Sequence, residues 1–187
     1  MKNFETESFA AEEPEEEKER TFQQYIENLH LSPEDFQKDI LDVASGQSEF
    51  AAWAREHNAA KNIISIDSHP EGEFLDKKSA HALAEELPFA DKSFDLVLSH
   101  CAIPIVYSRD YESVEIQDKR TREIMEREIE AGLSEMLRVL RPEGELRFNA
   151  IPGGTDDDYE VFQDFRSAFD QILSKLEKEQ IRCNDNF

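Results

Sequence analysis

The feature that most constrains the fold of this chain is the alternation of short apolar segments with longer amphipathic ones after residue 38. The apolar segments are rich in β-branched or aromatic residues, which is typical of buried strands; they span residues 40–43, 62–67, 93–99 and 145–151. The amphipathic segments repeat apolar residues every three or four positions, which indicates helices; they span residues 49–57, 121–140 and 157–179. Strands that alternate with helices predict an α/β fold with a mainly parallel sheet.

One folded domain is expected, with an acidic tail in front of it. The chain has 187 residues, of which 39% are hydrophobic, and this is enough for a single core. Residues 1–20 are dominated by glutamate and bury too little apolar surface to offset the entropy of ordering them, so we expect a disordered tail. The domain is expected over residues 21–187. It opens with a short helix whose apolar face includes Phe22, Tyr25 and Leu29.

The formal net charge of −22 limits the classes of partner. Such a surface repels phosphate backbones, so electrostatic binding of DNA or RNA is disfavoured. A basic partner or a small substrate fits the charge better, and adaptation of the surface to high salt explains it equally well. Charge alone leaves these alternatives open.

The cysteines and the hydropathy pattern indicate a reducing compartment. Cys101 and Cys183 are too few for a disulfide framework or a structural zinc site, so both are expected to be reduced thiols. The first 20 residues contain no apolar run of signal-peptide length, and no later segment approaches the roughly 20 apolar residues that span a bilayer. We therefore expect a cytoplasmic protein. The aspartates at 156–158 are interpreted as the first turn of the last helix rather than as a metal site.

The residues that can carry chemistry lie at the carboxyl ends of the first two strands. Asp42 leads into a turn of small residues, Ala44, Ser45 and Gly46, which opens onto a helix. Small side chains are needed where a ligand must lie against backbone between a strand and a helix N-terminus. The second strand ends in Asp67, which is placed to accept hydrogen bonds from both hydroxyls of a ribose. This edge of the sheet is therefore our candidate site for a ribose-bearing ligand.

Two downstream stretches narrow the hypothesis. Residues 84–97 (AEELPFADKSFDLV) and 134–146 (SEMLRVLRPEGEL) resemble signature stretches of class I S-adenosylmethionine-dependent methyltransferases, in the order and at the separation found in that family. Together with the turn and Asp67, the resemblance covers roughly residues 38–151. It implies a Rossmann-like open sheet with helices on both faces, and S-adenosylmethionine as the cofactor.

The resemblance also implies roles for single residues. The methionine part of the cofactor would lie at the turn after the first strand, the ribose at Asp67 and the adenine at Ala84 and its neighbours. The methyl group and the substrate would lie just past the third strand, from Ser99 to Cys101. The implied cofactor-binding residues are Asp42, Ala44, Ser45, Gly46, Asp67, Ser68, Leu83, Ala84 and Ser99.

Several positions depart from the family pattern. The family usually has glycine where this chain has Ala44 and Ser48, and a carboxylate where it has Leu83. The interval from Asp67 to Leu87 is too short for the helix and strand that the family commonly inserts, so this flank of the sheet is expected to be reduced. Few residues follow the last helix, so the closing hairpin is expected to be missing. An exposed strand edge invites pairing with another chain, which raises the hypothesis of a homodimer.

His100 is the best-placed candidate for a catalytic base, because a histidine with a near-neutral pKa can deprotonate an amine or a hydroxyl. An ordinary loop histidine is the alternative, since methyl transfer from a sulfonium often requires little beyond alignment of nucleophile and methyl carbon. Cys101 beside it is expected to be a packed thiol rather than a nucleophile, because no neighbouring cation in the sequence would lower its pKa.

Three functions remain open. The leading hypothesis is S-adenosylmethionine-dependent methyl transfer to a small molecule or a protein. Its rival is a methyltransferase-like module that has lost cofactor binding and serves as a scaffold, which Ala44, Ser48 and Leu83 favour. A nucleotide-dependent oxidoreductase on a similar sheet is the third, and the two downstream stretches do not fit it. Fold likeness alone does not choose the reaction.

Overall fold

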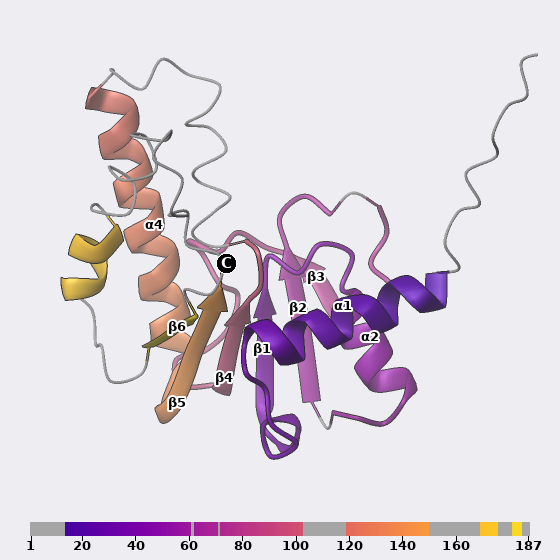
Figure 1. The fold of residues 1–187 in the computed structure, drawn as a ribbon. Coiled ribbons are helices and arrows are strands. Elements are labelled where there is room, and N and C mark those ends of the chain that lie inside the picture. Colours follow the sequence, from indigo (N-terminus) through magenta and orange to yellow (C-terminus); the bar gives the residue numbers. More distant parts are fainter. Residues whose placement is uncertain are drawn as a thin grey trace, which may run out of the picture.

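The structure, a computed structural model, describes residues 14–60, 62–70, 72–102, 119–149, 169–175 and 181–184. Its centre is a six-stranded sheet in the order β3-β2-β1-β4-β5-β6, in which every neighbouring pair is parallel (Figure 1). The strands are β1 (Asp39–Val43), β2 (Asn62–Asp67), β3 (Ser79–His81), β4 (Phe94–Ser99), β5 (Leu140–Asn149) and β6 (Ile181–Asn184). All four strands expected from the sequence are present and parallel, which confirms the α/β fold.

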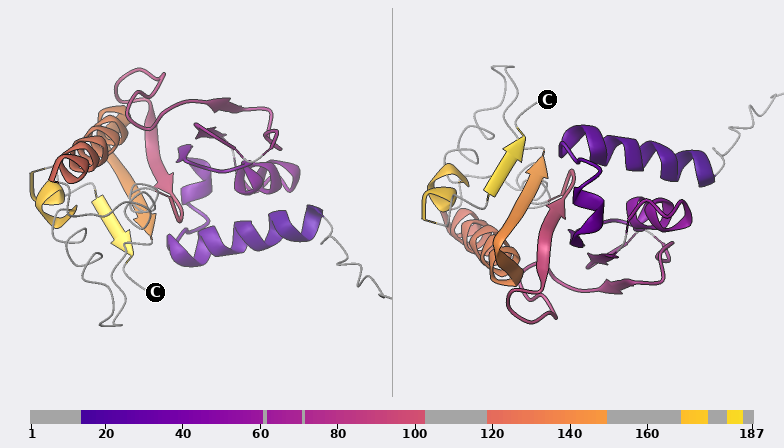
Figure 2. Two further views of the ribbon diagram at one scale, coloured as in Figure 1. Left: turned by 90° about the horizontal axis from the view of Figure 1, so that it is seen from above. Right: turned by 90° about the horizontal axis from the view of Figure 1, so that it is seen from below.

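Helices cover both faces of the sheet (Figure 2). On one face, α1 (Pro14–Asn28) and α2 (Glu49–Glu56) bury Tyr25 and Phe50 against the strands. On the other face, α4 (Lys119–Val139) and a helical segment at 169–175 pack around a second cluster. That cluster contains Leu41, Val97, Leu133, Met136, Phe148 and Phe169. Burial on both faces explains why β1, β2 and β4 have apolar residues at consecutive positions, as at residues 40–41, 63–64 and 96–98.

The expected helices are confirmed where the structure describes them. α2 matches the prediction to one residue, and α4 ends at Val139, one residue early, because Leu140 already pairs with Phe94 as the first residue of β5. The last helix, expected over 157–179, is confirmed over 169–175. The remainder of that prediction, with the aspartates at 156–158, lies outside the described residues.

The N-terminal helix begins earlier than the sequence predicted. α1 starts at Pro14, so residues 14–20, which were expected to belong to the acidic tail, are helical. Proline suits the first helical position because the N–H that it lacks would be unpaired there. Further along the helix, Phe22 stacks on Trp53 of α2 with ring centroids 4.2 Å apart, which anchors α1. Residues 1–13 lie outside the described part of the chain.

The flank beyond β2 is reduced, as the short interval predicted. It contains the three-residue strand β3, which pairs with β2, and the described residues between the two strands form no helix. Instead, Arg55 of α2 donates two hydrogen bonds to the Asp76 carboxylate, at 2.6 and 2.9 Å. The Asp76 N–H donates to Ser48 Oγ at 3.1 Å. A three-residue strand and this connection need fewer residues than a helix and a full strand.

At the opposite edge of the sheet, the described residues form one strand, β6, rather than a hairpin. β6 pairs with β5 from Leu146 opposite Ile181 to Asn149 opposite Asn184. The edge of β5 that motivated the hypothesis of a homodimer is therefore paired within the chain, and the dimer stays a hypothesis without that argument.

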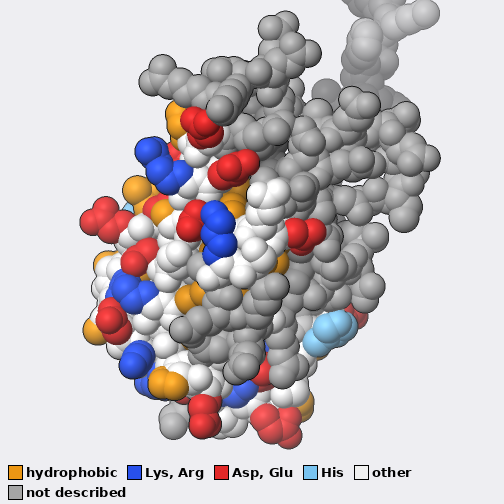
Figure 3. All heavy atoms as spheres, turned by 90° about the vertical axis from the view of Figure 1, so that its left-hand side faces the viewer, with side chains coloured by type: hydrophobic (Ala, Val, Ile, Leu, Met, Phe, Trp, Pro, Cys, Tyr) orange, Lys and Arg blue, Asp and Glu red, His pale blue; other side chains and the backbone are white. Residues whose placement is uncertain are grey.

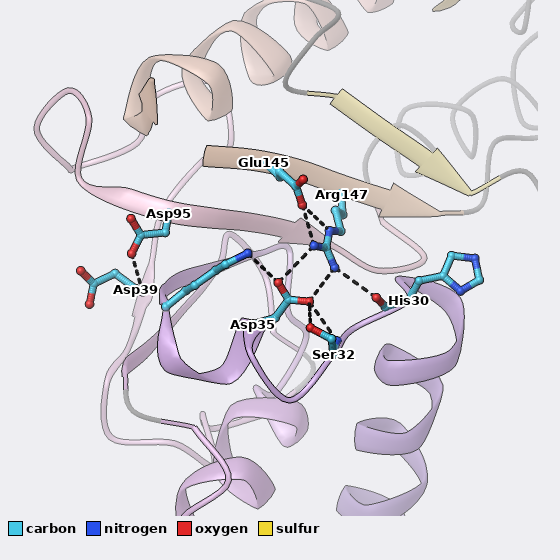
Figure 4. Close-up of polar contacts among 8 residues, drawn as sticks. His30, Ser32, Asp35, Asp39, Asp95, Glu145 and Arg147 are labelled. Atoms are coloured by element: carbon cyan, nitrogen blue, oxygen red, sulfur yellow. Dashed lines mark hydrogen bonds and ion pairs between the residues drawn. The ribbon is translucent and has the colours of Figure 1, made fainter. Parts of the chain in front are cut away.

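A buried ion pair ties the chain between α1 and β1 to the sheet (Figure 4). Arg147 of β5 donates hydrogen bonds to both carboxylate oxygens of Asp35, at 2.9 and 3.1 Å, and to the backbone oxygen of His30 at 3.2 Å. Glu145 binds the same guanidinium group. Asp35 belongs to the short 3-10 turn η1 (Asp35–Gln37), and Arg147 is only 9% exposed.

The described surface carries charges of both signs. Figure 3 shows acidic and basic side chains interspersed over one face, without a continuous basic surface among the residues it colours. None of the described helices has an apolar stretch long enough to cross a membrane. Within the same residues, no group of three or more His, Cys, Asp or Glu side chains is arranged to hold a metal ion.

Candidate functional site

The turn after β1 has the backbone of a glycine-rich turn. Ala44, Gly46 and Ser48 have φ of +57°, +59° and +65°, the left-handed region that glycine adopts without steric cost. A side chain in this region costs about 1–2 kcal/mol. The two side chains that replace glycine both make contacts within the protein. Ala44 packs against the core cluster on the α4 side, and Ser48 Oγ accepts a hydrogen bond from the Asp76 N–H. The turn therefore keeps its conformation despite the substitutions.

Asp67, at the end of β2, is joined to this turn. Its Oδ2 accepts a hydrogen bond from the Gly46 N–H at 2.9 Å, and its Oδ1 accepts one from the His69 N–H at 2.7 Å. A carboxylate has about four acceptor positions, so two remain for hydroxyl groups. A Cβ placed on Gly46 would meet no atom nearer than Glu49 Oε2 at 3.9 Å, so there is space beside the turn. Ser68, the next residue after Asp67, is exposed.

Asp42 is buried among protein groups. Its side chain is 0% exposed on the face that α1 and α2 cover. Tyr25 donates a hydrogen bond to Oδ1 at 3.0 Å, and Ser65 Oγ lies 3.4 Å from Oδ2. Burial raises the pKa of Asp42 to about 7, against the effect of these hydroxyls, and the charges of Glu49 and Asp67 add to the rise. Asp42 therefore lies in the protein interior next to the turn and is not exposed to a ligand.

Ser45 and Ser99 are buried polar residues at the ends of β1 and β4. Ser45 is 7% exposed, and its Oγ has no hydrogen-bond partner among the described residues. A buried hydroxyl without a partner costs about 1–3 kcal/mol, so a ligand that bonds it is favoured. Ser99 is fully buried as the last residue of β4.

The segment that follows β3 provides apolar surface next to Asp67. The Ala82 N–H donates to the backbone oxygen of Asp67 at 3.1 Å, which places the segment beside this residue. Leu83 is 52% exposed, and Ala84 packs half-buried against the core cluster on the α4 side. A large apolar side chain that is exposed beside a candidate site offers a surface on which a planar ring of a ligand can pack.

His100 follows β4 and is contacted by α1. Asn28 Nδ2 lies 2.9 Å from His100 Nε2, and the Tyr25 and His100 rings have centroids 4.4 Å apart. Burial lowers the pKa of His100 to about 4. The expectation of a near-neutral pKa is therefore wrong, and at neutral pH this imidazole is an uncharged, weak base.

Cys101 is exposed rather than packed as expected. Its backbone has φ of +50°, and its N–H donates to Asn149 Oδ1 at 2.9 Å. Desolvation raises the pKa of its thiol. A protonated thiol is a poor nucleophile, which agrees with the prediction that Cys101 does not act as one.

Three residues of this site were missed by the sequence analysis. Tyr25 was assigned to an apolar helix face, although a buried tyrosine hydroxyl usually needs a partner, and that was its signal. Asn149 ends β5, and open α/β sheets place ligands at the carboxyl ends of strands, which was a second signal. Asn28 carried no signal, because only the docking of α1 brings it to the end of β4.

Comparisons with known proteins agree with this geometry. A family model described as "Methyltransferase domain" matches residues 41–148, more than half of the chain. Two curated relatives from Stenotrophomonas maltophilia, strains K279a and R551-3, are both named ubiquinone/menaquinone biosynthesis C-methyltransferase UbiE. Each is 27% identical over 176 residues, which cover 87% of this chain and 60% of the relative, so this chain spans well under the full length of either.

The fold is shared with a solved structure from Bacillus halodurans, described as that of a candidate methyltransferase. The TM-score is 0.53 at 17% identity, and the match covers 83% of this chain and 68% of that one. Similarity at this level supports the fold alone, whereas the family model supports the assignment. The chain therefore belongs to the class I S-adenosylmethionine-dependent methyltransferases.

Proposed function

We propose that this chain binds S-adenosylmethionine at the carboxyl ends of β1, β2 and β4 and transfers its methyl group to a small molecule or a protein. The observation that carries the proposal is the hydrogen bond from Gly46 to Asp67, within a turn that holds three left-handed residues. Ser45 and Gly46 would hold the methionine part of the cofactor, and Asp67 its ribose. The unpartnered Ser45 hydroxyl supports this placement.

Other residues suit the remaining parts of the cofactor. Leu83 and Ala84 offer apolar surface for the adenine, and Ser68 lies beside the ribose position. Ser99 and His100 stand at the end of β4, where the methyl group and its acceptor would meet. The bound cofactor supplies an electrophilic methyl group on a sulfonium sulfur. The protein would contribute alignment of that carbon with the acceptor atom.

The charge of the site favours this cofactor over a dinucleotide. Glu49 and Asp67 lie close enough to Asp42 to raise its pKa, so negative potential surrounds the turn. A sulfonium cation is attracted to such a potential, whereas a pyrophosphate is repelled. This supports methyl transfer against the oxidoreductase hypothesis.

The rival function is a scaffold that no longer binds the cofactor. It is favoured by the side chains of Ala44 and Ser48 at positive φ and by Leu83 in place of a carboxylate. The acceptor is proposed only as a small molecule or a protein, and the cytoplasmic location stays a prediction.

Calorimetric titration of the full chain with S-adenosylmethionine and with its demethylated product separates the two functions. Saturable binding of both supports methyl transfer, and no binding at millimolar cofactor supports the scaffold. Ser45→Ala should weaken binding roughly tenfold, because one hydrogen bond contributes about 1.4 kcal/mol. Ser79→Ala is the matched control, since Ser79 Oγ is also buried without a described partner but belongs to β3.

A further inference from the structure

The imidazole of His100 is held by two elements that lie far apart in the sequence. Asn28, the last residue of α1, places Nδ2 2.9 Å from His100 Nε2. The Tyr25 ring packs on the imidazole with 31° between the ring planes. The neighbouring backbone, at Cys101, is fixed by Asn149 of β5. The orientation of the ring is therefore determined before any ligand arrives.

Asn28 places its amide nitrogen, rather than its amide oxygen, toward His100 Nε2. An asparagine amide nitrogen has two N–H donors and no acceptor, so this arrangement calls for an unprotonated Nε2. A neutral imidazole then has its proton on Nδ1. Burial keeps the ring neutral, because it lowers the pKa of His100 to about 4. Cys101 Sγ also lies near Nε2, at 3.7 Å, and among the described residues no hydrogen bond is formed to Nδ1.

We propose that Asn28 is a positioning residue that holds His100 as a hydrogen-bond donor, with the Nδ1–H left for the methyl acceptor. The inference rests on the proposed methyl transfer. It adds that the protein offers a hydrogen-bond donor, and not a base, to the molecule that accepts the methyl group. His100 does not remove a proton in this arrangement. It donates a hydrogen bond to an acceptor atom, such as a carbonyl oxygen, close to the atom that takes the methyl group.

A hydrogen-bond donor at His100 Nδ1 defines the class of substrate. The acceptor has a nucleophilic atom whose lone pair is available without help from His100, and a hydrogen-bond-accepting oxygen beside it. The lone pair forms the bond to the methyl carbon, and the electron pair of the breaking carbon–sulfur bond returns to sulfur. A proton lost from the methylated product passes to solvent.

Nuclear magnetic resonance of the full chain with ¹⁵N-labelled histidine reads the tautomer of each ring through two-bond ¹H–¹⁵N correlations. The chain has five histidines, and the His100 signal is identified by its loss in His100→Gln. At pH 7 we expect the Nδ1–H form in the wild type and a severalfold loss of that form in Asn28→Ala. Asn28→Asp should move the proton to Nε2 and raise the pKa of His100, because a carboxylate accepts a hydrogen bond from Nε2–H.

Asn58→Asp is the matched control, because it adds the same charge at an exposed position after α2 and should leave the tautomer unchanged. A wild-type His100 in the Nε2–H form would overturn the proposal, and so would an Asn28→Ala spectrum identical to that of the wild type. If Asn28→Ala does not fold, the wild type and Asn28→Asp decide. The spectra require no cofactor, so a protein that has the Nδ1–H form but binds no cofactor refutes the proposed function and not the positioning.

Discussion

Asp35 and Asp42 are both buried carboxylates, but their surroundings are opposite. Asp35 is 3% exposed and is bonded by Arg147 and by Lys38 Nζ, the latter at 2.7 Å. Asp42 is 0% exposed and is bonded by hydroxyl groups, chiefly that of Tyr25. Burial acts to raise the pKa of both groups. At Asp35 the hydrogen bonds from its partners outweigh burial and hold the pKa well below its usual range, whereas the pKa of Asp42 rises to about 7.

The difference separates a residue placed for stability from one placed beside a site. The ion pair of Asp35 with Arg147 joins η1 to β5, and both side chains are bonded to other protein groups. A cation beside Asp42 would cancel the negative potential at the turn where we propose a cationic cofactor. Local rules of stability are commonly broken at functional sites, and an uncompensated buried carboxylate fits that pattern.

The largest effect is expected from breaking the Asp35 pair. Arg147→Met should lower the free energy of unfolding by about 3–5 kcal/mol, because the buried Asp35 carboxylate loses its two hydrogen bonds from the guanidinium group and keeps only Lys38 as a cationic partner. Arg141→Met on the same strand is the control: its partners Asp39 and Asp95 are exposed by more than a third, so the loss should stay below about 1 kcal/mol. Urea denaturation measures both variants. Equal losses would contradict the special role of the buried pair.

Removing the hydroxyl that bonds Asp42 should have a smaller effect. Tyr25→Phe is expected to cost about 1–3 kcal/mol, because Asp42 Oδ1 loses its donor inside the fold. The pKa of Asp42 should rise further in this variant, since the hydrogen bond from Tyr25 lowers it. Urea denaturation at pH 8 gives the first quantity, and its repetition between pH 5 and 8 gives the second. Unchanged stability would show that this hydrogen bond does not hold α1 in place.

The pH dependence of stability tests the two shifted pKa values against each other. The folded pKa of Asp42, about 7, lies above its unfolded value of 3.8, so the stability that this group contributes is lost as pH rises between those values. The free energy of unfolding of Asp42→Asn relative to that of the wild type should therefore increase as pH rises, by up to about 1.4 kcal/mol per pH unit across that range. The folded pKa of His100, about 4, lies below 6.5, so its contribution is lost as pH falls between those values.

The free energy of unfolding of His100→Gln relative to that of the wild type should accordingly increase as pH falls, which is the reverse of the trend expected for Asp42→Asn. Both variants are followed by denaturation at pH 4 to 8. Two slopes of the same sign would refute the assignment of one of these pKa values.

The smallest effect is expected within the turn. Ala44→Gly should stabilise the protein by about 0.5–1 kcal/mol, because relief of the left-handed backbone exceeds the entropy that glycine adds to the unfolded chain. Ser48→Gly relieves the same conformation but removes the oxygen that accepts the Asp76 N–H, so it should be neutral or destabilising. Thermal denaturation compares the pair. A gain in Ser48→Gly equal to that in Ala44→Gly would show that the Ser48 hydroxyl has no structural role.

The central strands could be predicted from the sequence and the edge strands could not. Ile63 and Ile66 point to opposite faces of β2, and burial of both faces leaves isoleucines concentrated in a short segment, a signal that is readable locally. β3 consists of Ser79–His81, which has no strand propensity of its own and is ordered by pairing with β2. β6 depends in the same way on β5.

The candidate site shows the same division. The turn and Asp67 were predicted to lie together, and the hydrogen bond from Gly46 to Asp67 confirms that they do. The full burial of Asp42, the low pKa of His100 and the contact with Asn28 all depend on α1 docking against the sheet. No local pattern encodes that docking, so these properties required the structure.

The most direct test of the account is calorimetric titration of Asp67→Ala with the demethylated cofactor, beside the wild type. A carboxylate that accepts two hydroxyl hydrogen bonds contributes about 2–4 kcal/mol, so the variant should bind roughly 30-fold to several hundred-fold more weakly. Asp91→Ala removes the same charge at a side chain that is 71% exposed and should bind as the wild type does. Equal affinity of Asp67→Ala and the wild type would contradict the placement of the ribose and, with it, the proposed site.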